Sequence, residues 1–372
     1  MNRTGTILLE FDPHLKKLRK DKKLWDGLSA VVQIGDMLWI ANDEALSLER
    51  LSRQRETAGG EIRYADHRQF PLHEVLQLPM PPATDGKIEE ADIEGLDYDG
   101  GYLWLVGSHS LKRGKPDEED SIEKNTKRLA KVSRDGNRFL LARIPLAQAT
   151  QSLERKVEQD GSSRTAARLR GDADGNALTE ALATDEHLGP FLAIPGKDNG
   201  FDLEGLAIAG DRVFVGLRGP VLRGWTVLLE LAVEEQDPST LTLKSIGADG
   251  RPYRKHFLDL RGLGVRDLCA QGSDLLILAG PTMALAGPLT IFRWPGGARP
   301  DRESLVFSEA LPKVLKLPFG THQNAGQDQA EGLTLFAPNG GEASQILIVY
   351  DSTAPRRQRE TSAVEADLFA LP

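Results

Sequence analysis

The sequence predicts an all-β protein, a five-bladed β-propeller that forms a single domain over residues 1–372. Three observations lead to this prediction. A short two-strand phrase occurs five times, most copies lie about 65 residues apart, and the last copy is followed by too few residues for a whole blade.

The repeated phrase is clearest at residues 202–219, which read D-L-E-G-L-A-I-A-G-D-R-V-F-V-G-L-R-G. Two apolar runs flank a Gly-Asp pair, and this pattern is typical of an antiparallel hairpin. The phrase returns as D-I-E-G-L-D-Y-D-G-G-Y-L-W-L-V-G-S and as E-G-L-T-L-F, with looser copies from Asp26 and Arg266. We expect each copy to supply the first two strands of a blade.

The two ends of the chain are predicted to complete one blade together. The run T-I-L-L-E-F-D near the N-terminus precedes the first phrase and has no blade of its own, whereas only A-D-L-F-A-L follows late in the last blade. We therefore expect the N-terminal strand to close the last blade, because closure removes the open edge of the sheet.

The second blade is predicted to be followed by an insertion. Its third and fourth strands are assigned to R-L-A-K-V-S from Arg128 and F-L-L-A-R-I-P-L from Phe139. A surplus of residues at about 148–197 then precedes the third blade, and its runs A-Q-A-T-Q-S-L-E-R-K-V-E-Q and A-L-T-E-A-L-A-T-D-E-H-L have helix-like composition. The expectation is a helical insertion between blades two and three.

Composition and charge restrict the classes of function. The net charge of −9 argues against nucleic-acid binding through phosphates, and no dinucleotide fingerprint or phosphate-binding loop suggests a nucleotide cofactor. The N-terminus lacks the apolar region of a signal peptide, and no apolar run is long enough to span a membrane. We therefore expect a cytoplasmic protein without a membrane or nucleic-acid partner.

The repeat also predicts a site. The first strand of each propeller blade lines the central axis, so the charged residue that opens each phrase should face a common centre. These residues are Asp26, Glu94, Glu204, Arg266 and Glu331. The four carboxylates are candidate ligands of a hard cation such as Ca²⁺.

Residues just past the second strands should reach the same face of the propeller. They are Asp43, Ser108, His109, Arg218 and Asp351. Together with Arg266, Arg218 could hold a small anionic or phosphorylated ligand in bidentate fashion. Metal-dependent hydrolysis of a phosphoester is the reaction that this combination of groups would suit.

A structural interpretation competes with the functional one. A repeated carboxylate in a repeated fold can accept hydrogen bonds from the next blade and act only as a fastener. The protein would then be a non-enzymatic platform for protein interactions. An exposed apolar patch would favour the platform, whereas a concave site with convergent polar groups would favour a small ligand.

With its E-G-L phrases, the chain resembles the bacterial family of unknown function DUF3616, which is of propeller type. The phrases D-I-E-G-L, D-L-E-G-L and Q-A-E-G-L carry this resemblance. More distantly, the chain looks like the esterase-like phytase and calcium-activated apyrase propellers, whose axial acidic residues hold calcium. That resemblance implies Glu94, Glu204 and Glu331 as metal ligands, although Arg266 departs from an all-acidic ring.

Overall fold

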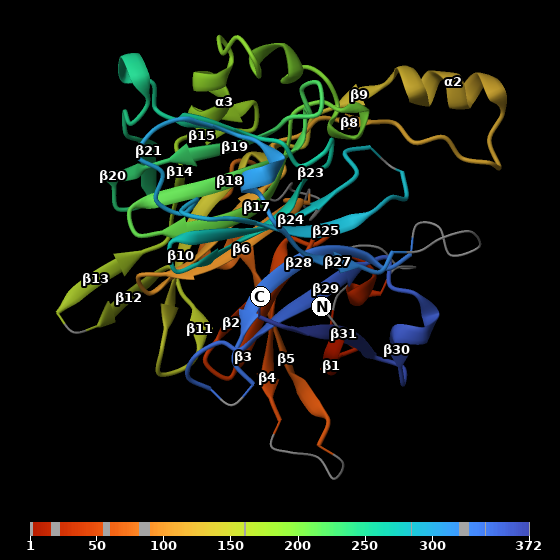
Figure 1. The fold of residues 1–372 in the computed structure, drawn as a ribbon. Helices are drawn as coiled ribbons and strands as arrows, with labels where there is room; N and C mark the ends of the chain where they lie inside the picture. The colour runs from red at the N-terminus through yellow and green to blue at the C-terminus, as the bar shows by residue number, and fades with distance from the viewer. Residues whose placement is uncertain are drawn as a thin grey trace.

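The computed structural model describes residues 3–15, 23–54, 60–81, 90–159, 161–283, 285–319, 327–338 and 340–371. In this part of the chain, β-strands dominate and the helices are short (Figure 1). No helix of the described residues is long and apolar enough to cross a membrane.

The strands pair mostly antiparallel, and each group of paired strands is called a sheet here and named by its first strand. The β2 sheet contains β2 (Leu28–Ile34), β3 (Met37–Asn42), β4 (Ser47–Arg53) and β5 (Ile62–Pro71). The β6 sheet contains β6 (Ile93–Asp99), β7 (Tyr102–Gly107), β10 (Leu141–Ala147) and β14 (Ala167–Leu169), and it is extended by β11 (Ser152–Leu153), β21 (Thr240–Leu243) and β20 (Val233–Asp237).

The C-terminal half of the chain supplies the other large sheets. The β17 sheet contains β17 (Asp202–Ala209), β18 (Arg212–Gly219), β19 (Thr226–Leu231), β22 (Arg254–Leu258) and β26 (Ser304–Val306). The β23 sheet contains β23 (Gly264–Gln271), β24 (Asp274–Gly280), β25 (Leu289–Trp294) and β27 (Lys313–Leu317). The β28 sheet contains β28 (Gln329–Phe336), β29 (Gln345–Asp351), β31 (Ala363–Ala370), β1 (Arg3–Glu10) and the short β30 (Gln358–Arg359). The pairs β1–β5, β14–β21 and β22–β26 are parallel, and the first of them joins the β2 and β28 sheets into one nine-stranded sheet.

Short elements occupy the connections. Three two-stranded sheets are β8 (Lys112–Arg113) with β9 (Val132–Ser133), β12 (Lys156–Gln159) with β13 (Ser162–Thr165), and β15 (Gly171–Asp172) with β16 (Gly175–Asn176). The α-helices are α1 (Leu72–Val75), α2 (Ile122–Ala130) and α3 (Ala177–Leu182). Turns of 3₁₀-helix are η1 (Leu24–Asp26), η2 (Gly136–Phe139), η3 (Gly189–Phe191), η4 (Gly196–Asp198), η5 (Ala248–Gly250), η6 (Ser308–Ala310) and η8 (Pro355–Arg357).

The first strands of the sheets form a closed circuit. Strand β2 contacts β6, β6 contacts β17, β17 contacts β23, β23 contacts β28, and β28 contacts β2. An apolar cluster fills each junction between neighbouring sheets, and the clusters contain the largest buried side chains, among them Trp39, Phe214 and Phe336. Radial sheets around a circuit of inner strands define a β-propeller, as the repeat predicted.

Two residue types of the repeated phrase allow the inner strands to approach one another. A Cβ added to Gly95 on β6 would lie 2.7 Å from the backbone nitrogen of Leu206 on β17, so only glycine fits. Two residues later, the carboxylate of Asp97 accepts a hydrogen bond of 2.6 Å from the backbone N–H of Ile208. On β23, Asp267 accepts from the N–H of Leu333 on β28 at 2.7 Å. These aspartates, rather than the glutamates of the phrase, fasten sheet to sheet through backbone groups.

The N-terminal strand lies where the sequence placed it. Strand β1 pairs antiparallel with β31, with register from Arg3 opposite Phe369 to Glu10 opposite Ala363. It also pairs in parallel with β5, and this contact joins the β28 sheet to the β2 sheet. The prediction that this run closes the C-terminal sheet is therefore confirmed.

The predicted helical insertion is wrong in its first half. Residues 152–165 form strand β11 and the hairpin β12–β13, which turns at Gly161 with φ +74°. Val157 is buried between exposed Lys156 and Glu158, which is the alternation of a strand rather than the face of a helix. The second half does contain a helix, α3, whose first turn is capped by the side chain of Asn176.

The outer strands of the β6 sheet also differ from the prediction. The run from Arg128 belongs to the end of α2 and to β9, which lies outside the sheet. Strand β10 is the third strand, and β14, within the expected insertion, is the fourth. The short apolar run from Arg128 could not show by its pattern alone that it lies at the end of a helix.

Candidate functional site

A bulge in each inner strand positions the charged residue of the phrase. The pairing of β6 with β7 is irregular between Ile93 and Gly95, and equivalent irregularities occur in β17, β23 and β28. The residues at these bulges are Glu94, Glu204, Arg266 and Glu331. Because a bulge leaves its residue outside the regular ladder, it can re-aim that side chain toward the circuit of inner strands.

In the β2 sheet the equivalent bulge contains Ser29 rather than Asp26. The register shifts between Leu28 and Ala30, and Ser29 Oγ donates a hydrogen bond of 2.5 Å to the carbonyl oxygen of Ile93. Asp26 lies three residues earlier in η1, where its carboxylate accepts from the backbone N–H of Lys23 at 3.1 Å. The sequence alignment matched Asp26 to the glutamates because it used the first charged residue of each copy. In the first copy the structurally equivalent position is three residues later, at Ser29.

Two arginines link the carboxylates on one side of the circuit. Arg266 Nη1 lies 2.5 Å from Glu331 Oε1 and 3.4 Å from Glu204 Oε2, and Arg218 Nη1 lies 2.7 Å from Glu204 Oε1. All four side chains are buried. The result is a chain of alternating charges that joins β28, β23, β17 and β18.

The same arginines also hold a neighbouring loop. Arg218 Nε donates to the carbonyl oxygen of Thr282 at 2.9 Å, and Arg266 Nη2 donates to that of Pro281 at 3.2 Å. Both guanidinium groups are therefore committed to protein carboxylates and carbonyls. Their pairing leaves little positive charge for the anionic ligand that the sequence suggested.

Glu94 lies in a different environment from the other two glutamates. Apart from burial, the strongest influences on its carboxyl group are other carboxylates. Burial raises the pKa of Glu94 well above its ordinary value, and the carboxylates of Glu204, Asp92 and Glu331 raise it further. Glu94 is thus a buried carboxyl group among other carboxylates.

Asp43 and Asp351 stand on either side of Gly27. The N–H of Asp43 donates to the carbonyl oxygen of Gly27 at 3.1 Å, and Gly27 forms a β-bridge with Asp351. Burial and the nearby carboxylate of Asp351 raise the pKa of Asp43 well above its ordinary value. Asp43 Oδ1 is buried and lacks a hydrogen-bond partner among the described residues.

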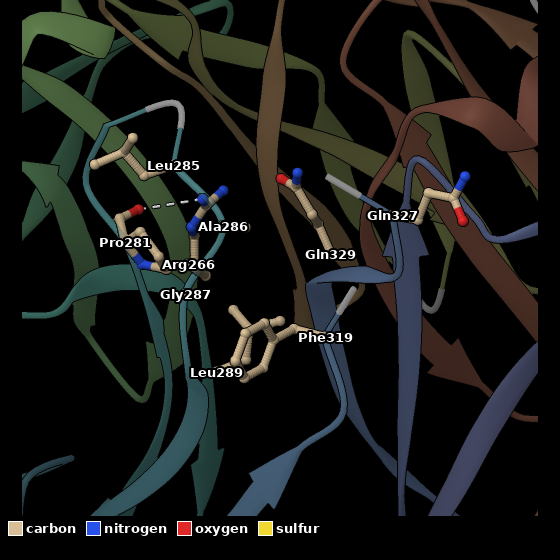
Figure 2. Close-up of a pocket in the computed structure, with 9 residues that line it drawn as sticks. All are labelled: Arg266, Pro281, Leu285, Ala286, Gly287, Leu289, Phe319, Gln327 and Gln329. Carbon is tan, nitrogen blue, oxygen red and sulfur yellow. Dashed lines mark hydrogen bonds between the residues drawn. The ribbon is translucent and has the colours of Figure 1, made fainter. Parts of the chain in front are cut away.

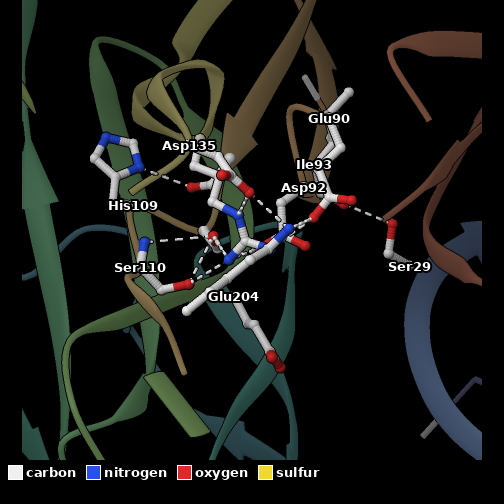
Figure 3. Close-up of polar contacts among 12 residues, drawn as sticks. Ser29, Glu90, Asp92, Ile93, His109, Ser110, Asp135 and Glu204 are labelled. Carbon is white, nitrogen blue, oxygen red and sulfur yellow. Dashed lines mark hydrogen bonds and ion pairs between the residues drawn. The ribbon is translucent and has the colours of Figure 1, made fainter. Parts of the chain in front are cut away.

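Two aspartates that precede the glutamates of the phrase, Asp92 and Asp202, lie among the same charged groups. Asp92 pairs with Arg138 at 2.8 Å, and Arg138 also contacts Glu90 at 2.9 Å (Figure 3). Burial and Glu204 raise the pKa of Asp202 to about 7. Burial and Asp351 likewise raise the pKa of Glu331 to about 7, although Arg266 opposes the rise.

The sequence interpretation missed Asp92, Asp202 and Arg138. The first two were visible in the phrase itself, since D-I-E-G-L and D-L-E-G-L each carry an aspartate two positions before the glutamate. Arg138 lies in η2 and has no counterpart in the other copies, so its role depends on tertiary contacts alone. We use the name axial cluster for these groups: Asp43, Asp92, Glu94, Arg138, Asp202, Glu204, Arg218, Arg266, Glu331 and Asp351.

Ser108 and His109 lie beside the axial cluster but are engaged in other contacts. Ser108 Oγ lies 3.0 Å from Ser110 Oγ, and Arg138 donates to Ser110 Oγ at 2.8 Å (Figure 3). His109 Nδ1 donates to the carbonyl oxygen of Gly107 at 2.7 Å, and its Nε2 accepts from the side-chain amide of Asn176 at 2.7 Å. Burial lowers the pKa of His109 to about 4, so the ring is neutral near pH 7. Both ring nitrogens already make hydrogen bonds within the protein.

The residues predicted to hold calcium do not fit that ion in this arrangement. Within the described ranges, no group of three or more His, Cys, Asp or Glu side chains is arranged to hold a metal ion. Glu204 and Glu331 are bound to guanidinium groups, and Asp26 caps a 3₁₀ turn. A calcium ion would have to displace these arginines before it could use the two glutamates.

The chain is similar in structure to several known proteins. They include a streptogramin B lyase (8% identity, 98% of each chain, TM-score 0.34) and a luciferin-regenerating enzyme (8% identity, 99% of this chain and 96% of that one, TM-score 0.37). The PQQ-bound aldose sugar dehydrogenase from Streptomyces coelicolor is another (13% identity, 94% and 97%, TM-score 0.31). No curated protein matches the sequence. The family model described as "Protein of unknown function (DUF3616)" matches residues 27–367, and the chain therefore belongs to this family.

Proposed function

We propose that this protein is a five-bladed propeller whose axial cluster binds a small polar ligand that carries positive charge. The closed circuit of inner strands supports the blade count, since each of β2, β6, β17, β23 and β28 begins one run of antiparallel strands, with β2 and β28 at the two ends of the nine-stranded sheet. We infer a cationic ligand from one observation: the axial cluster contains more carboxylates than guanidinium groups.

The crowding of carboxylates explains why a cation suits this place. Four neighbouring carboxylates raise the pKa of Glu94, and Asp43 Oδ1 is buried without a hydrogen-bond partner among the described residues. Carboxylates that face one another in a buried site retain protons unless a positive charge compensates them. An ammonium or guanidinium group of a ligand would supply both the charge and the N–H donors.

The paired arginines argue against the anionic ligand predicted from the sequence. Arg218 and Arg266 already bind Glu204 and Glu331, so a phosphate would have to compete with intramolecular carboxylates and face the carboxyl group of Glu94. Metal-dependent hydrolysis of a phosphoester stays a prediction with less support, because it requires both the anion and the metal ion at this place.

The raised pKa values of the carboxyl groups predict that binding of a cation depends on pH. The pKa values of Asp202 and Glu331 lie at about 7, and that of Glu94 is also raised. A bound cation favours the ionised carboxylates, so binding near pH 7 should release protons. Affinity should therefore increase as the pH rises from 6 to 8.

Titration calorimetry with primary amines would test the proposed function. Methylamine, putrescine and agmatine are suitable probes, with inorganic phosphate and calcium chloride as competing ligand classes. We expect an amine to bind with proton release, measured in buffers of different ionisation enthalpy. Glu94→Gln should weaken binding by about tenfold or more, since it removes a charged hydrogen-bond acceptor.

The matched control is Glu118→Gln, because Glu118 is exposed and outside the axial cluster. This variant should bind like the unaltered protein. Binding of phosphate or calcium in place of every amine would overturn the proposed ligand class. Equal loss in both variants would show that Glu94 has no particular role.

An interaction platform is the second candidate, and helix α2 favours it. The helix projects from the sheets (Figure 1), none of its residues is buried, and Ile122 is 87% exposed. Leu129 and Val132 are also exposed large apolar side chains. Ile122→Ser with Leu129→Ser should abolish stoichiometric binding of an identified protein partner and leave amine binding unchanged if α2 serves as a platform.

A further inference from the structure

A short segment of the chain lies directly against one carboxylate of the axial cluster. We call this segment, residues 195–200 with η4 inside it, the cover segment. A Cβ added to Gly196 would lie 2.5 Å from Asp202 Oδ2, so the backbone of Gly196 packs against this carboxylate. Asp202 itself is only 4% exposed. The cover segment therefore touches the axial cluster directly.

Burial changes abruptly along the cover segment. Pro195 and Gly196 are buried, whereas the next two residues, Lys197 and Asp198, are exposed. The segment thus presents one side to the Asp202 carboxylate and the other side to solvent. A single turn of the chain separates the two.

Two contacts hold the cover segment to β8 and to the residue before it. The N–H of Gly196 donates to the carbonyl oxygen of Leu111 at 3.2 Å, and Arg113 Nε donates to Asp198 Oδ2 at 2.5 Å. Arg113 Nη1 also donates to the carbonyl oxygen of Leu129, at the end of α2, at 2.6 Å. The guanidinium group of Arg113 is therefore oriented by α2 and bound to the cover segment.

The far end of the cover segment is fixed separately. The N–H of Val221 donates to Asn199 Oδ1 at 3.0 Å, and Asn199 has the left-handed φ of +61°. The ion pair at the other end is the more easily broken contact, because the side chains of Arg113 and Asp198 are both 34% exposed. Loss of this pair would let the segment swing about its Asn199 end.

Strand β8 provides a firm support for this ion pair. Lys112 pairs with Glu90, Glu90 pairs with Arg138, and Arg138 pairs with Asp92 of the axial cluster (Figure 3). Adjacent residues of β8 therefore have different roles. Lys112 anchors the strand to the axial cluster, and Arg113 holds the cover segment to the strand.

A pocket beside Arg266 is too small to serve as an entrance to the axial cluster (Figure 2). It is lined by the loop that joins β24 to β25, by Phe319 and by Gln327, and it has space for about one water molecule. Gln327 Oε1 is a buried acceptor without a partner among the described residues, and such a water could donate to it.

We infer that the cover segment closes one side of the axial cluster, that the cationic ligand enters beneath it, and that Arg113 is the positioning residue that holds it closed. This inference rests on the proposed function, because the axial cluster is taken as the ligand site. Arg113 acts through Asp198 and lies outside the axial cluster. Its loss should therefore change how fast the ligand enters and leaves more than how tightly it is held.

Chemical labelling of Asp202 tests the cover segment without a ligand. The full-length protein would be treated with a water-soluble carbodiimide and glycinamide at pH 6, and labelling of Asp202 would be followed by peptide mass spectrometry. Arg113→Met and Asp198→Ala both break the ion pair, so each should accelerate this labelling by about two- to fivefold. Gly196→Ala should accelerate it as well, because the added Cβ pushes the segment away from the carboxylate.

The matched control is Arg170→Met. Arg170 lies in the same connection between β10 and β17 as the cover segment, and it pairs with Glu180 on the surface at 2.7 Å. In this variant Asp202 should be labelled as fast as in the unaltered protein. Circular dichroism would verify that all variants fold.

Binding kinetics test the role of Arg113. Exchange measurements by NMR with methylamine at pH 8 would give the association and dissociation rates. Arg113→Met should raise both rates by about two- to fivefold and leave the affinity nearly unchanged. A lower affinity with an unchanged association rate would contradict the assigned role.

The outcomes separate the cover segment from the proposed function. If labelling of Asp202 is unchanged in Arg113→Met, Asp198→Ala and Gly196→Ala, this inference is wrong while the axial proposal stands. Equal acceleration in Arg170→Met would also overturn it, since the whole connection would then be loosened. If labelling accelerates as expected but no amine binds, the proposed function is overturned, and with it the route assigned to the ligand.

Discussion

Arg266→Met should destabilise the protein strongly at pH 8 and only weakly at pH 5. The guanidinium group is 3% exposed and contacts Glu331 at 2.5 Å, Glu204 at 3.4 Å and the carbonyl oxygen of Pro281 at 3.2 Å. Methionine keeps much of the side-chain volume but leaves the buried Glu331 without its arginine, whereas Glu204 keeps its pair with Arg218. Breaking a buried ion pair in this way typically costs about 3–5 kcal/mol of unfolding free energy.

The pH dependence follows from the carboxyl groups that remain. The pKa of Glu331 is already raised to about 7 in the folded protein, chiefly by burial, and loss of Arg266 should raise this pKa further. The folded state then holds a proton that the unfolded state releases above about pH 4.5. Stability of the variant therefore falls as the pH rises from about 5 through 7, and below this window the electrostatic penalty is absent.

At pH 5 the remaining cost should be about 1–2 kcal/mol, because the carbonyl oxygen of Pro281 still loses its donor. Urea unfolding followed by fluorescence and circular dichroism would measure both values. The double variant Arg266→Met with Glu331→Gln should recover part of the loss at pH 8. Arg359→Met is the control, since Arg359 is 56% exposed and pairs with Glu365 on the surface.

Two results would refute this reasoning. An equal loss of stability at pH 5 and pH 8 would mean that lost packing, rather than uncompensated charge, explains the effect. A loss at pH 8 no larger than that of Arg359→Met would mean that the chain of alternating charges does not stabilise the fold.

Two further predictions concern how the sheets are joined, and a third concerns a buried histidine. Gly95→Ala should cost about 1–3 kcal/mol in urea unfolding, because its Cβ would meet the backbone of β17 at 2.7 Å, whereas Gly5→Ala has open space and should be nearly neutral. Asp97→Ala should cost about 1–3 kcal/mol, since the N–H of Ile208 loses its acceptor, and hydrogen exchange of that amide should accelerate. His109 has its pKa lowered to about 4, so it contributes stability above about pH 6.5 that is lost as the pH falls toward 4; His109→Gln should remove this part of the pH dependence of the unfolding free energy.

Most of the architecture could be predicted from the sequence alone. The period of the E-G-L phrase, its Gly-Asp turn and the orphan N-terminal run were sufficient to predict hairpins around a common centre, and also the pairing of β1 with β31. These features are local or periodic, and a chain pattern reports them directly. The phrase also indicated which residues would converge, because a bulge recurs at the same place in each inner strand.

Tertiary structure decided what the converging residues do. The spacing of residues along the chain does not reveal that Arg266 forms ion pairs with Glu331 and Glu204. It also does not reveal that Ser29 rather than Asp26 occupies the first bulge. The strands within the expected insertion were equally hidden, because short polar segments take their conformation from the partner they pack against. Charge compensation is a property of neighbours in space, so whether a ring of charged residues attracts an anion or a cation depends on contacts between residues far apart in the chain.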